Sequence, residues 1–435
     1  MTAPGIDLEA AARRDADAVG EATEADGTST GKPGRLRRWL IILGCTLLIL
    51  AGLGYAGYRY LLTTEWGVFF TLFADDERAE NFRTMDEIFP SRDIAAGASV
   101  RELDRDERDL PASYDFEGES HALDDFLDRT ETTGLVVLHH GTLVHEQYRE
   151  GYDAESRATS WSMAKSMVSA LIGIAIEDGH IDSRDDQVTA YVPQLIGSGY
   201  DGATIRDLLT MSSGVDFDEG YDATFADINM IFVRAMGFGE PMLDYYASLE
   251  RAREPGTFND YVSSDTGVLA AVLTGATGQP VASYLEAEVW QPAGMEGDAF
   301  WSLDRTDAEI GFCCMNAQLR DYARFGQLYL DDGVRDGERI LPEGWVEAST
   351  NPEAPRLEPG DNPDSSWTFG YGYQWWVPEG RVNGEFTAIG VWGQYVYVDP
   401  TNGVVIAKSS TDGDFDDNDH ESIAAFRAIA EEITR

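Results

Sequence analysis

A run of 20 residues without a charged side chain, Trp39 to Tyr58, limits what this chain can form more than any other segment. A helix of that length matches the hydrocarbon thickness of a bilayer. Trp39 lies at one end and tyrosines lie at the other, and aromatic side chains of this kind favour the membrane–water interface. The run therefore predicts a transmembrane anchor over residues 39–58.

Basic residues directly before the run, Lys32, Arg35, Arg37 and Arg38, predict its orientation. Positive charges beside a span stay in the cytoplasm, so the part that follows the span lies outside it. The tail before the span, residues 1–38, starts with a polar stretch without an apolar period, which predicts a disordered cytoplasmic segment. We therefore expect a single-pass protein of the cell (inner) membrane, with an extracytoplasmic soluble part.

Two other interpretations of the apolar run fit less well. A cleaved signal peptide has a shorter apolar region that ends in small residues, whereas this run and the tail before it are both long. A lipoprotein signal needs its cysteine at the end of the run, and Cys45 lies near the start. An uncleaved anchor fits best. Residues 59–80 then form a linker and residues 81–435 form the soluble domain.

The soluble part shows strand patterns at its two ends and helical patterns between them. Residues 134–148 alternate on both sides of His140-Gly141, which predicts a β-hairpin. Periodicity predicts helices over 162–177, 204–211, 265–273, 319–330 and 421–434, and strands over 371–378, 385–389, 394–400 and 403–409. The pattern predicts a discontinuous sheet domain with a mostly helical part inserted into it.

The charge balance excludes one class of partner. Against 78 acidic residues stand 32 basic ones, for a net charge of −46, so no broad basic surface is available for nucleic acid. A surface this acidic and poor in lysine would stay soluble in concentrated salt, which screens its self-repulsion. We therefore hypothesise a saline habitat. The alternative is a GC-rich genome that encodes Arg, Asp and Glu in preference to Lys.

Cysteine and histidine provide no framework for disulfides or metals. Three cysteines are too few for a disulfide scaffold. Cys313 and Cys314 are neighbours, and we expect both to be small buried residues without a bond between them. The six histidines show no spacing typical of metal ligands. We therefore expect neither a metal site nor another cofactor.

The motif Ser162-Met-Ala-Lys165 is the first candidate for chemistry. On a helix, an offset of three places both side chains on one face, about one turn apart. A lysine amine beside a serine hydroxyl can take its proton and make it a nucleophile. The chain has three lysines, Lys32, Lys165 and Lys408, and its other basic residues are arginines, which cannot act as bases. This usage favours a chemical role for Lys165.

Two later motifs complete a recognisable order. Tyr261-Val-Ser263 lies about 100 residues after the serine and follows a Pro-Gly turn. A late strand ends in Gly390-Val-Trp-Gly393, where glycine lets a substrate approach the backbone. This order resembles the serine β-lactamase and penicillin-binding-protein superfamily. It is most similar to the branch of class C β-lactamases, family VIII carboxylesterases and 6-aminohexanoate-dimer hydrolase. Five segments carry the resemblance, which covers roughly residues 80–435: 161–166, 204–214, 261–266, 319–326 and 370–376.

The resemblance implies an α+β fold of the β-lactamase/transpeptidase-like type, in which an antiparallel sheet is flanked by helices and a mostly helical subdomain is inserted. It also assigns roles to residues. Ser162 would be the nucleophile that accepts the acyl group, and Lys165 would be its base. Tyr261 would be the second acid/base group, which passes a proton to the leaving amine or alkoxide. The backbone N–H groups of Ser162 and Val391 would form the oxyanion hole. By the same resemblance, Asn316 would belong to the substrate pocket. Trp392 lies inside the glycine motif and is a second candidate for the pocket lining, and Tyr221, which follows Asp216–Gly220, is a third.

Departures from the superfamily pattern narrow the expected substrates. Penicillin-directed enzymes carry Lys-Thr-Gly on the late strand, where this chain has Ala388-Ile389-Gly390 and lacks a cation for a β-lactam carboxylate. They also have Tyr-x-Asn in place of Tyr-x-Ser. We therefore expect a hydrolase of small-molecule esters or amides. A β-lactamase or D-amino-acid peptidase acting on cell-wall material, and a catalytically silent binding relative, remain alternatives. The oligomeric state stays open.

Overall fold

The computed structural model describes residues 34–61, 71–221 and 223–435, and the chain divides into two compact units, Met1–Leu61 and Leu62–Arg435. In the first unit, residues Arg35–Leu61 form helix α1. Residues 37–60 of this helix are long and apolar enough to cross a membrane, and its large apolar side chains, such as Leu48, are exposed. The helix expected over 39–58 is therefore present.

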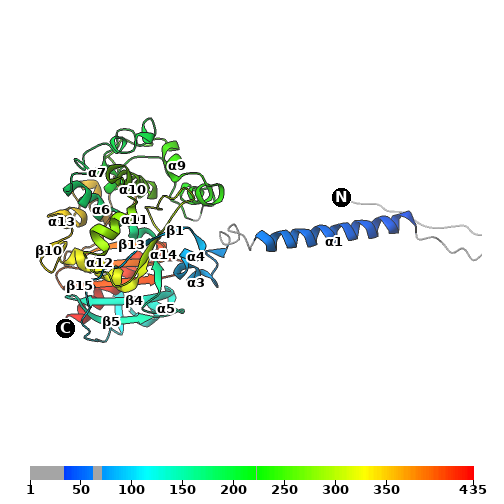
Figure 1. Cartoon of the computed structure of the whole chain (residues 1–435). Helices are drawn as coiled ribbons and strands as arrows, with labels where there is room; N and C mark the ends of the chain where they lie inside the picture. The colour runs from blue at the N-terminus through cyan, green and yellow to red at the C-terminus, as the bar shows by residue number, and fades with distance from the viewer. Residues whose placement is uncertain (1–33, 62–70, 222) are drawn as a thin grey trace, which may run out of the picture. The chain divides into compact units, whose positions relative to one another are not determined.

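The second unit is built around a sheet in which seven strands of the described residues pair antiparallel, in the order β11-β12-β13-β14-β15-β4-β5. Strands from the two ends of the unit meet where β15 pairs with β4, so the sheet is discontinuous in sequence, as expected. Figure 1 shows these strands side by side. Their bounds are Thr132–His139 (β4), Thr142–Tyr148 (β5), Gly370–Tyr371 (β11), Trp376–Val377 (β12), Phe386–Gly390 (β13), Gln394–Asp399 (β14) and Val404–Ser410 (β15).

The predicted hairpin is confirmed as β4 and β5. His140 and Gly141 connect the two strands, and their φ angles of 48° and 77° are those of a two-residue turn whose twist matches the strands. Alternate side chains of a strand point to opposite sides of the sheet. Nearly all side chains of β4, β14 and β15 are buried, so both faces of the sheet are covered. On β4, Val136 and Leu138 join one hydrophobic cluster, and Leu135 and Val137 join the other.

Helices cover both faces of this sheet. Apolar side chains of α12 (Leu319–Leu330) belong to the first cluster, and those of α14 (Phe415–Ile433) and α5 (Leu123–Arg129) belong to the second. Gly326 allows α12 to pack closely against β14 and β15. A Cβ at this position would lie 2.7 Å from side-chain atoms of both Val396 and Val405. The sheet is therefore a middle layer between helices, which is the α+β arrangement predicted.

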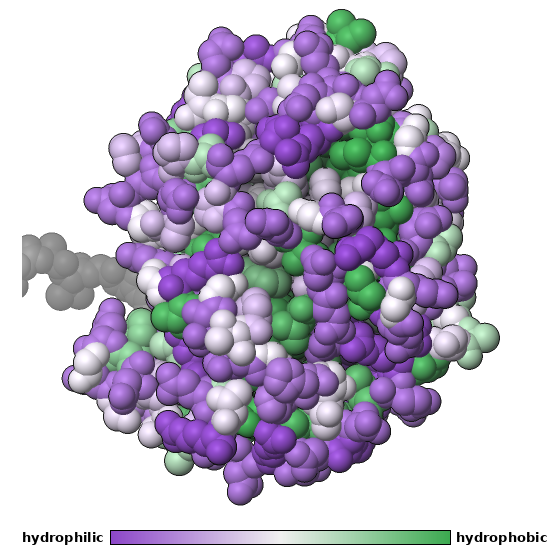
Figure 2. Space-filling view, turned by 90° about the vertical axis from the view of Figure 1, so that its left-hand side faces the viewer, coloured by the Kyte–Doolittle hydropathy of each residue, from purple (hydrophilic) through white to green (hydrophobic). Residues whose placement is uncertain are grey.

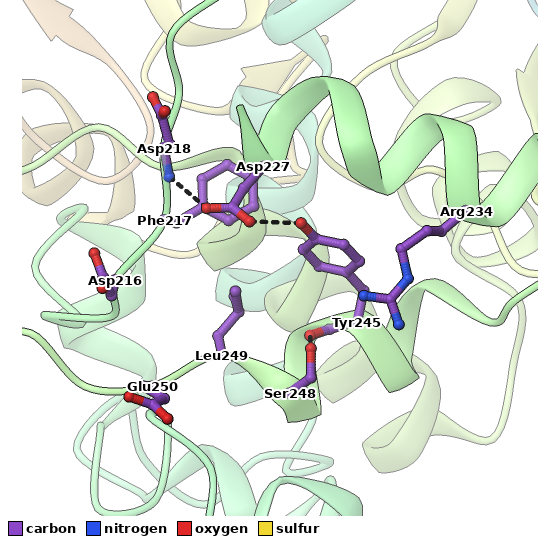
Figure 3. A pocket seen from close by; sticks show the side chains of 9 residues that line it. All are labelled: Asp216, Phe217, Asp218, Asp227, Arg234, Tyr245, Ser248, Leu249 and Glu250. Carbon is purple, nitrogen blue, oxygen red and sulfur yellow. Dashed lines mark hydrogen bonds between the residues drawn. The ribbon is translucent and has the colours of Figure 1, made fainter. Parts of the chain in front are cut away.

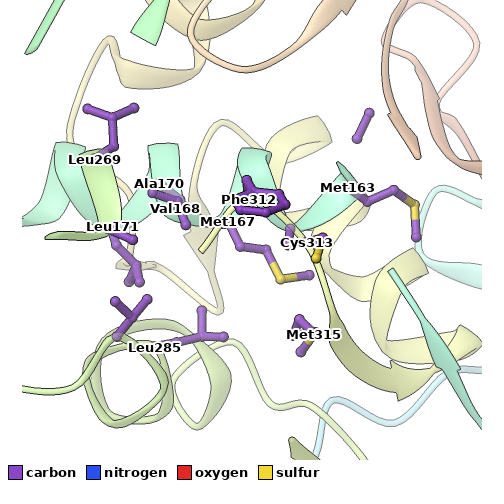
Figure 4. Packing of buried hydrophobic residues seen from close by; sticks show 14 of the residues in the cluster. Met163, Met167, Val168, Ala170, Leu171, Leu269, Leu285, Phe312, Cys313 and Met315 are labelled. Carbon is purple, nitrogen blue, oxygen red and sulfur yellow. The ribbon is translucent and has the colours of Figure 1, made fainter. Parts of the chain in front are cut away.

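The segment between β5 and β11 contains mostly helices, which lie on the side of the sheet opposite β5 and the C-terminus in Figure 1. Its long helices, α6 and α10, pack together in the core. Figure 4 shows Met167 and Leu171 of α6 among side chains from α10, α11 and β8. The helices are α6 Ala164–Glu177, α7 Ile205–Leu209, α8 Asp227–Phe232, α9 Met242–Ser248, α10 Ser263–Thr277, α11 Val281–Leu285 and α13 Trp345–Thr350. Short 3-10 or π segments are Val188–Ala190, Pro193–Leu195, Val233–Gly237, Glu286–Trp290 and Pro355–Leu357.

A second sheet was not predicted. It has the order β1-β7-β8-β6, with bounds Ser91–Ile94 (β1), Ala299–Ser302 (β7), Met315–Gln318 (β8) and Arg157–Thr159 (β6). Its strands have at most four residues, too few to show a clear alternation in sequence. Smaller hairpins are formed by β2 (Ser113–Phe116) with β3 (Glu119–Ala122), and by β9 (Val334–Arg335) with β10 (Glu338–Arg339).

The prediction of a single strand over 371–378 is wrong, because this segment forms two short strands. It divides into β11 and β12, which a turn at Gln374 separates, and Gln374 has a φ of 63°. The turn is held because the Gln374 amide accepts from Thr266 Oγ1 (2.6 Å) and donates to the Leu208 carbonyl (2.9 Å). The segment therefore joins the edge of the sheet to the helical part.

Candidate active site

Ser162 and Lys165 lie where the chain enters α6. A 3-10 turn, Trp161–Met163, directly precedes the helix, so Ser162 lies in this turn, two residues before α6, and Lys165 lies in the first turn of α6. The helix is apolar around most of its circumference and is buried among the other helices, which fixes both residues. The Lys165 Nζ lies 2.8 Å from the Ser162 Oγ. The structure thus brings together the first predicted pair.

Lys165 is held in a position that favours its neutral form. Its Nζ also contacts the Ser263 Oγ at 3.1 Å and the Phe312 carbonyl oxygen at 3.0 Å. Burial lowers the pKa of Lys165 to about 7, against the opposing influence of Glu219. Near neutral pH a large fraction of this amine is therefore unprotonated and able to accept a proton.

Tyr261 lies against the same pair. The Lys165 Nζ is 4.9 Å from the centre of its ring, and Trp376 stacks on the ring at 5.1 Å. Burial raises the pKa of Tyr261, and so does Glu219, whereas a hydrogen bond with Ser162 opposes the rise. The phenol is therefore neutral at rest and is a proton donor rather than a standing base.

Glu219 is a site residue that the sequence analysis missed. Its carboxylate accepts from the Ser263 N–H (2.7 Å), the Ser263 hydroxyl (2.5 Å) and the Tyr221 hydroxyl (2.8 Å). Ser263 begins α10, so its N–H is one of the free donors at a helix N-terminus. Burial raises the pKa of Glu219, and Lys165 opposes the rise. A continuous hydrogen-bonded path therefore connects Lys165, Ser263 and Glu219.

The end of β13 lies against the turn that holds Ser162. A Cβ on Gly390 would lie 2.5 Å from the Ser160 carbonyl oxygen and 3.1 Å from the Ser162 amide nitrogen. Trp161 and Trp392, which flank the two predicted oxyanion donors, have φ angles of 41° and 65°. Bulky residues rarely adopt such angles, and they persist where surrounding structure enforces them. The backbone at both donors is therefore held in an unusual path.

A cavity of about 370 Å³ opens beside Ser162, and Val391, Trp392 and Tyr221 also line it. The structure thus brings four of the predicted site residues to one cavity. Asn316 does not reach its lining. This side chain is fully buried on β8 and donates to the Cys314 carbonyl oxygen at 2.8 Å. Its pocket role stays a prediction.

The expectation for the cysteine pair is corrected. Cys313 and Cys314 are buried, as expected, but a disulfide joins them. The chain turns at this point, because Cys314 has a φ of 70°, and an extended path would instead point adjacent side chains to opposite sides. Both cysteines line the cavity beside Ser162.

A second hollow, shown in Figure 3, contains none of the predicted site residues. Its centre is Asp227, which accepts from the Tyr245 hydroxyl at 2.5 Å and from the Asp218 N–H at 2.8 Å. This carboxylate is thus used to join α8 and α9 to the preceding loop. The hollow has a structural explanation without a ligand.

The antiparallel sheet between helical layers, with its inserted helical part, defines a class: this is a serine hydrolase with a β-lactamase/transpeptidase-like fold. A family model described as Beta-lactamase matches residues 120–429, and the chain belongs to this family.

Known proteins support the same assignment. The chain is 31% identical to 6-aminohexanoate-dimer hydrolase of Paenarthrobacter ureafaciens over 297 residues, which cover 66% of this chain and 75% of that protein. A solved structure of a candidate 6-aminohexanoate-dimer hydrolase from Bacillus anthracis is 25% identical, with a TM-score of 0.74 over 83% of this chain and 95% of the other. A family VIII carboxylesterase, 16% identical, shares the fold with a TM-score of 0.56 over 71% of this chain and 95% of its own.

Proposed function

We propose that this chain is a membrane-anchored hydrolase that cleaves ester or amide bonds through an acyl-enzyme on Ser162. The observation that carries the proposal is the 2.8 Å contact between Ser162 Oγ and a buried Lys165 whose pKa is about 7. A serine hydroxyl becomes a nucleophile when a neutral base takes its proton, and this geometry supplies that base.

The acylation step follows from these positions. Lys165 takes the hydroxyl proton while Ser162 Oγ forms a bond to the substrate carbonyl carbon. The N–H groups of Ser162 and Val391 stabilise the resulting oxyanion. The bond to the amine or alkoxide then breaks, the leaving group takes a proton from Tyr261, and the Lys165 ammonium returns a proton to Tyr261. Water repeats the sequence on the acyl-enzyme and releases the acid.

Membrane anchoring is the second part of the proposal. It is supported by the apolar helix α1, which is long enough to span, and by the basic residues Arg37 and Arg38 at its start. We place residues 1–38 in the cytoplasm, the anchor at 39–58, a linker at 59–80 and the hydrolase domain at 81–435, outside the cytoplasm. A signal sequence near the N-terminus would share the same apolar pattern.

One experiment tests both parts. Cells that express the full chain are treated with a fluorophosphonate on a long, uncharged, hydrophilic linker that does not cross membranes. We expect labelling of the wild type in intact cells and none in Ser162→Ala. Ser169→Ala is the matched control on the same helix, because its buried hydroxyl has no hydrogen-bond partner in the described residues. Labelling that persists in Ser162→Ala refutes the nucleophile, and labelling that appears only after lysis refutes the location.

A substrate panel then separates ester, amide and lactam hydrolysis. Nitrophenyl esters, short amides and nitrocefin are compared on the purified full chain. We expect esters or amides to be turned over and nitrocefin to be poor, because Ala388 and Ile389 stand where a β-lactam-binding cation is needed. Efficient nitrocefin hydrolysis would favour the β-lactamase alternative.

A further inference from the structure

The cavity beside Ser162 has a hydrophobic lining drawn from distant parts of the chain. Its apolar residues include Leu72, Phe89, Ile228, Phe232, Ile310 and Phe312. Its volume of about 370 Å³ is at the small end for ligand pockets. Ser162 itself forms part of the lining. A substrate group in this cavity therefore lies within a few bonds of the carbonyl carbon that the serine attacks.

Charge is absent from the lining. None of the described residues that line the cavity is Asp, Glu, Lys, Arg or His. The Arg78 guanidinium lies 4.6 Å from the centre of the Trp392 ring, but its Nη2 binds Glu131 at 2.7 Å. A charged group that leaves water for apolar surroundings without a partner is strongly disfavoured. An uncharged hydrophobic group is favoured in the same place.

One wall of the cavity comes from the segment 71–89, which includes α3 (Arg78–Arg83) and α4 (Met85–Ile88). Phe73 stacks on Trp392, with ring centres 5.3 Å apart and planes 11° apart, and Phe82 meets Trp161 edge-on at 5.1 Å. The family match begins at residue 120, so this wall lies outside it. The cavity is therefore completed by a segment that precedes the matched family region.

The geometry points to an acyl-binding subsite: the cavity takes the uncharged, hydrophobic acyl chain of the substrate, and the segment 71–89 selects for it. This inference rests on the proposed acyl-enzyme and adds the substrate class. The acyl chain enters the cavity while the leaving group departs on the side of Tyr261, whose ring lies outside the cavity lining. Esters or amides of medium-length fatty acids have this chemistry.

The first test varies the acyl group on one leaving group. The purified full chain in a non-ionic detergent is given p-nitrophenyl acetate and hexanoate. It is also given two matched pimelate esters, one ending in a methyl ester and one in a free carboxylate. We expect kcat/KM for hexanoate to exceed that for acetate by at least about tenfold. We expect the methyl-ended pimelate to exceed the carboxylate-ended one by at least about tenfold.

The second test places a cation at the wall. Phe73 is 43% exposed, so Phe73→Lys is expected to fold and to put an ammonium at the cavity. It should narrow the preference for the methyl-ended pimelate by about fivefold or more. Phe225→Lys is the matched control, because Phe225 is 85% exposed and is not in the lining, and it changes the net charge equally. At about 0.15 M salt the screening length is about 8 Å, so remote charges contribute little.

The outcomes separate this inference from the function on which it rests. Equal rates for acetate and hexanoate, or equal rates for the two pimelate esters, would overturn the subsite while leaving the hydrolase intact. Identical effects of Phe73→Lys and Phe225→Lys would also overturn it, because net charge alone would explain them. Failure to hydrolyse any ester or amide, together with no labelling of Ser162, would instead overturn the proposed function and this inference with it.

Discussion

The buried lysine of the site is subject to two opposing influences. Burial lowers the pKa of Lys165, and the carboxylate of Glu219 raises it, with the Ser263 hydroxyl between them. The aromatic hydroxyls nearby, Tyr221 and Tyr261, have pKa values raised by burial and stay neutral. Glu219 is therefore the charged group that opposes burial in setting how readily Lys165 loses its proton.

Replacing Glu219 by Gln tests this role through the pH dependence of kcat/KM. Lys165 must be neutral to act, so activity falls as pH drops through its pKa of about 7. Without the Glu219 charge, that pKa falls further, and the acidic limb of the profile moves to lower pH. Loss of the charged hydrogen bonds should also cost about 1–3 kcal/mol of stability. The measurement is kcat/KM across pH 4–9 on the full chain.

Two controls separate charge from structure in this experiment. Glu219→Asp keeps the charge and should leave the acidic limb close to that of the wild type. Asp216→Asn removes an exposed charge from the same loop and should not move the limb. A Glu219→Gln profile that loses height but keeps its midpoint would mean that Glu219 only supports the fold.

The proximity of site residues could be predicted where a motif fixes their spacing or order. Ser162 and Lys165 share a helix face at an offset of three, and Tyr261 follows in a known order, so their proximity was open to prediction. Glu219 was not, because it meets Lys165 only through the N-terminus of α10, and one carboxylate among 78 acidic residues gives no signal. The Cys313–Cys314 bond depends on a local backbone turn that sequence does not specify.

At the scale of elements, the junction of β13 with the turn before α6 positions the two proposed oxyanion donors. The strand itself was predictable from its apolar pattern, and so were β14 and β15. The contact between Gly390 and the backbone of Ser160 was not, because it depends on how the insertion packs on the sheet. The same reason explains why residues 371–378 form two strands around Gln374.

Replacing Gly390 by Ala should damage activity more than stability. The added Cβ would lie 2.5 Å from the Ser160 carbonyl oxygen, a backbone atom that cannot rotate away, so β13 must move from the Ser162 turn. Misplacing one oxyanion donor costs about 10²–10³ in rate, whereas overpacking costs about 1–3 kcal/mol. Steady-state kinetics and Tm check both.

Gly97→Ala is the control for this change, because its nearest neighbour is the Gln291 Cβ at 3.2 Å, away from the proposed site. We expect it to retain activity. Wild-type kcat/KM in Gly390→Ala would mean that the Val391 N–H takes no part in the reaction.

At the scale of the molecule, charge distinguishes this chain more than its fold does. Hydrophilic residues cover most of the face in Figure 2, and hydrophobic residues appear there mainly in hollows. Arginines form ion pairs in the described residues, such as Arg320 with Glu146 at 2.6 Å and Arg324 with Asp321 at 2.9 Å. Even so, the 78 acidic residues far outnumber the 32 basic residues that could pair with them, which leaves a net charge of −46. Self-repulsion therefore opposes the compact state.

Salt should stabilise the full chain by screening that repulsion. The screening length falls from about 10 Å at 0.1 M to about 3 Å at 1 M, so we expect Tm in a non-ionic detergent to rise by about 5 °C or more in concentrated KCl. Lowering the pH from 7 to 5 brings the chain towards its pI of about 4.2, which reduces its charge before salt is added. The gain from KCl should therefore shrink at pH 5.

A general salting-out effect would persist at both pH values, because it acts through excluded surface rather than through charge. Equal Tm in dilute buffer and in KCl at pH 7 would show that the acidic composition is no adaptation to salt, and would favour codon usage as its origin.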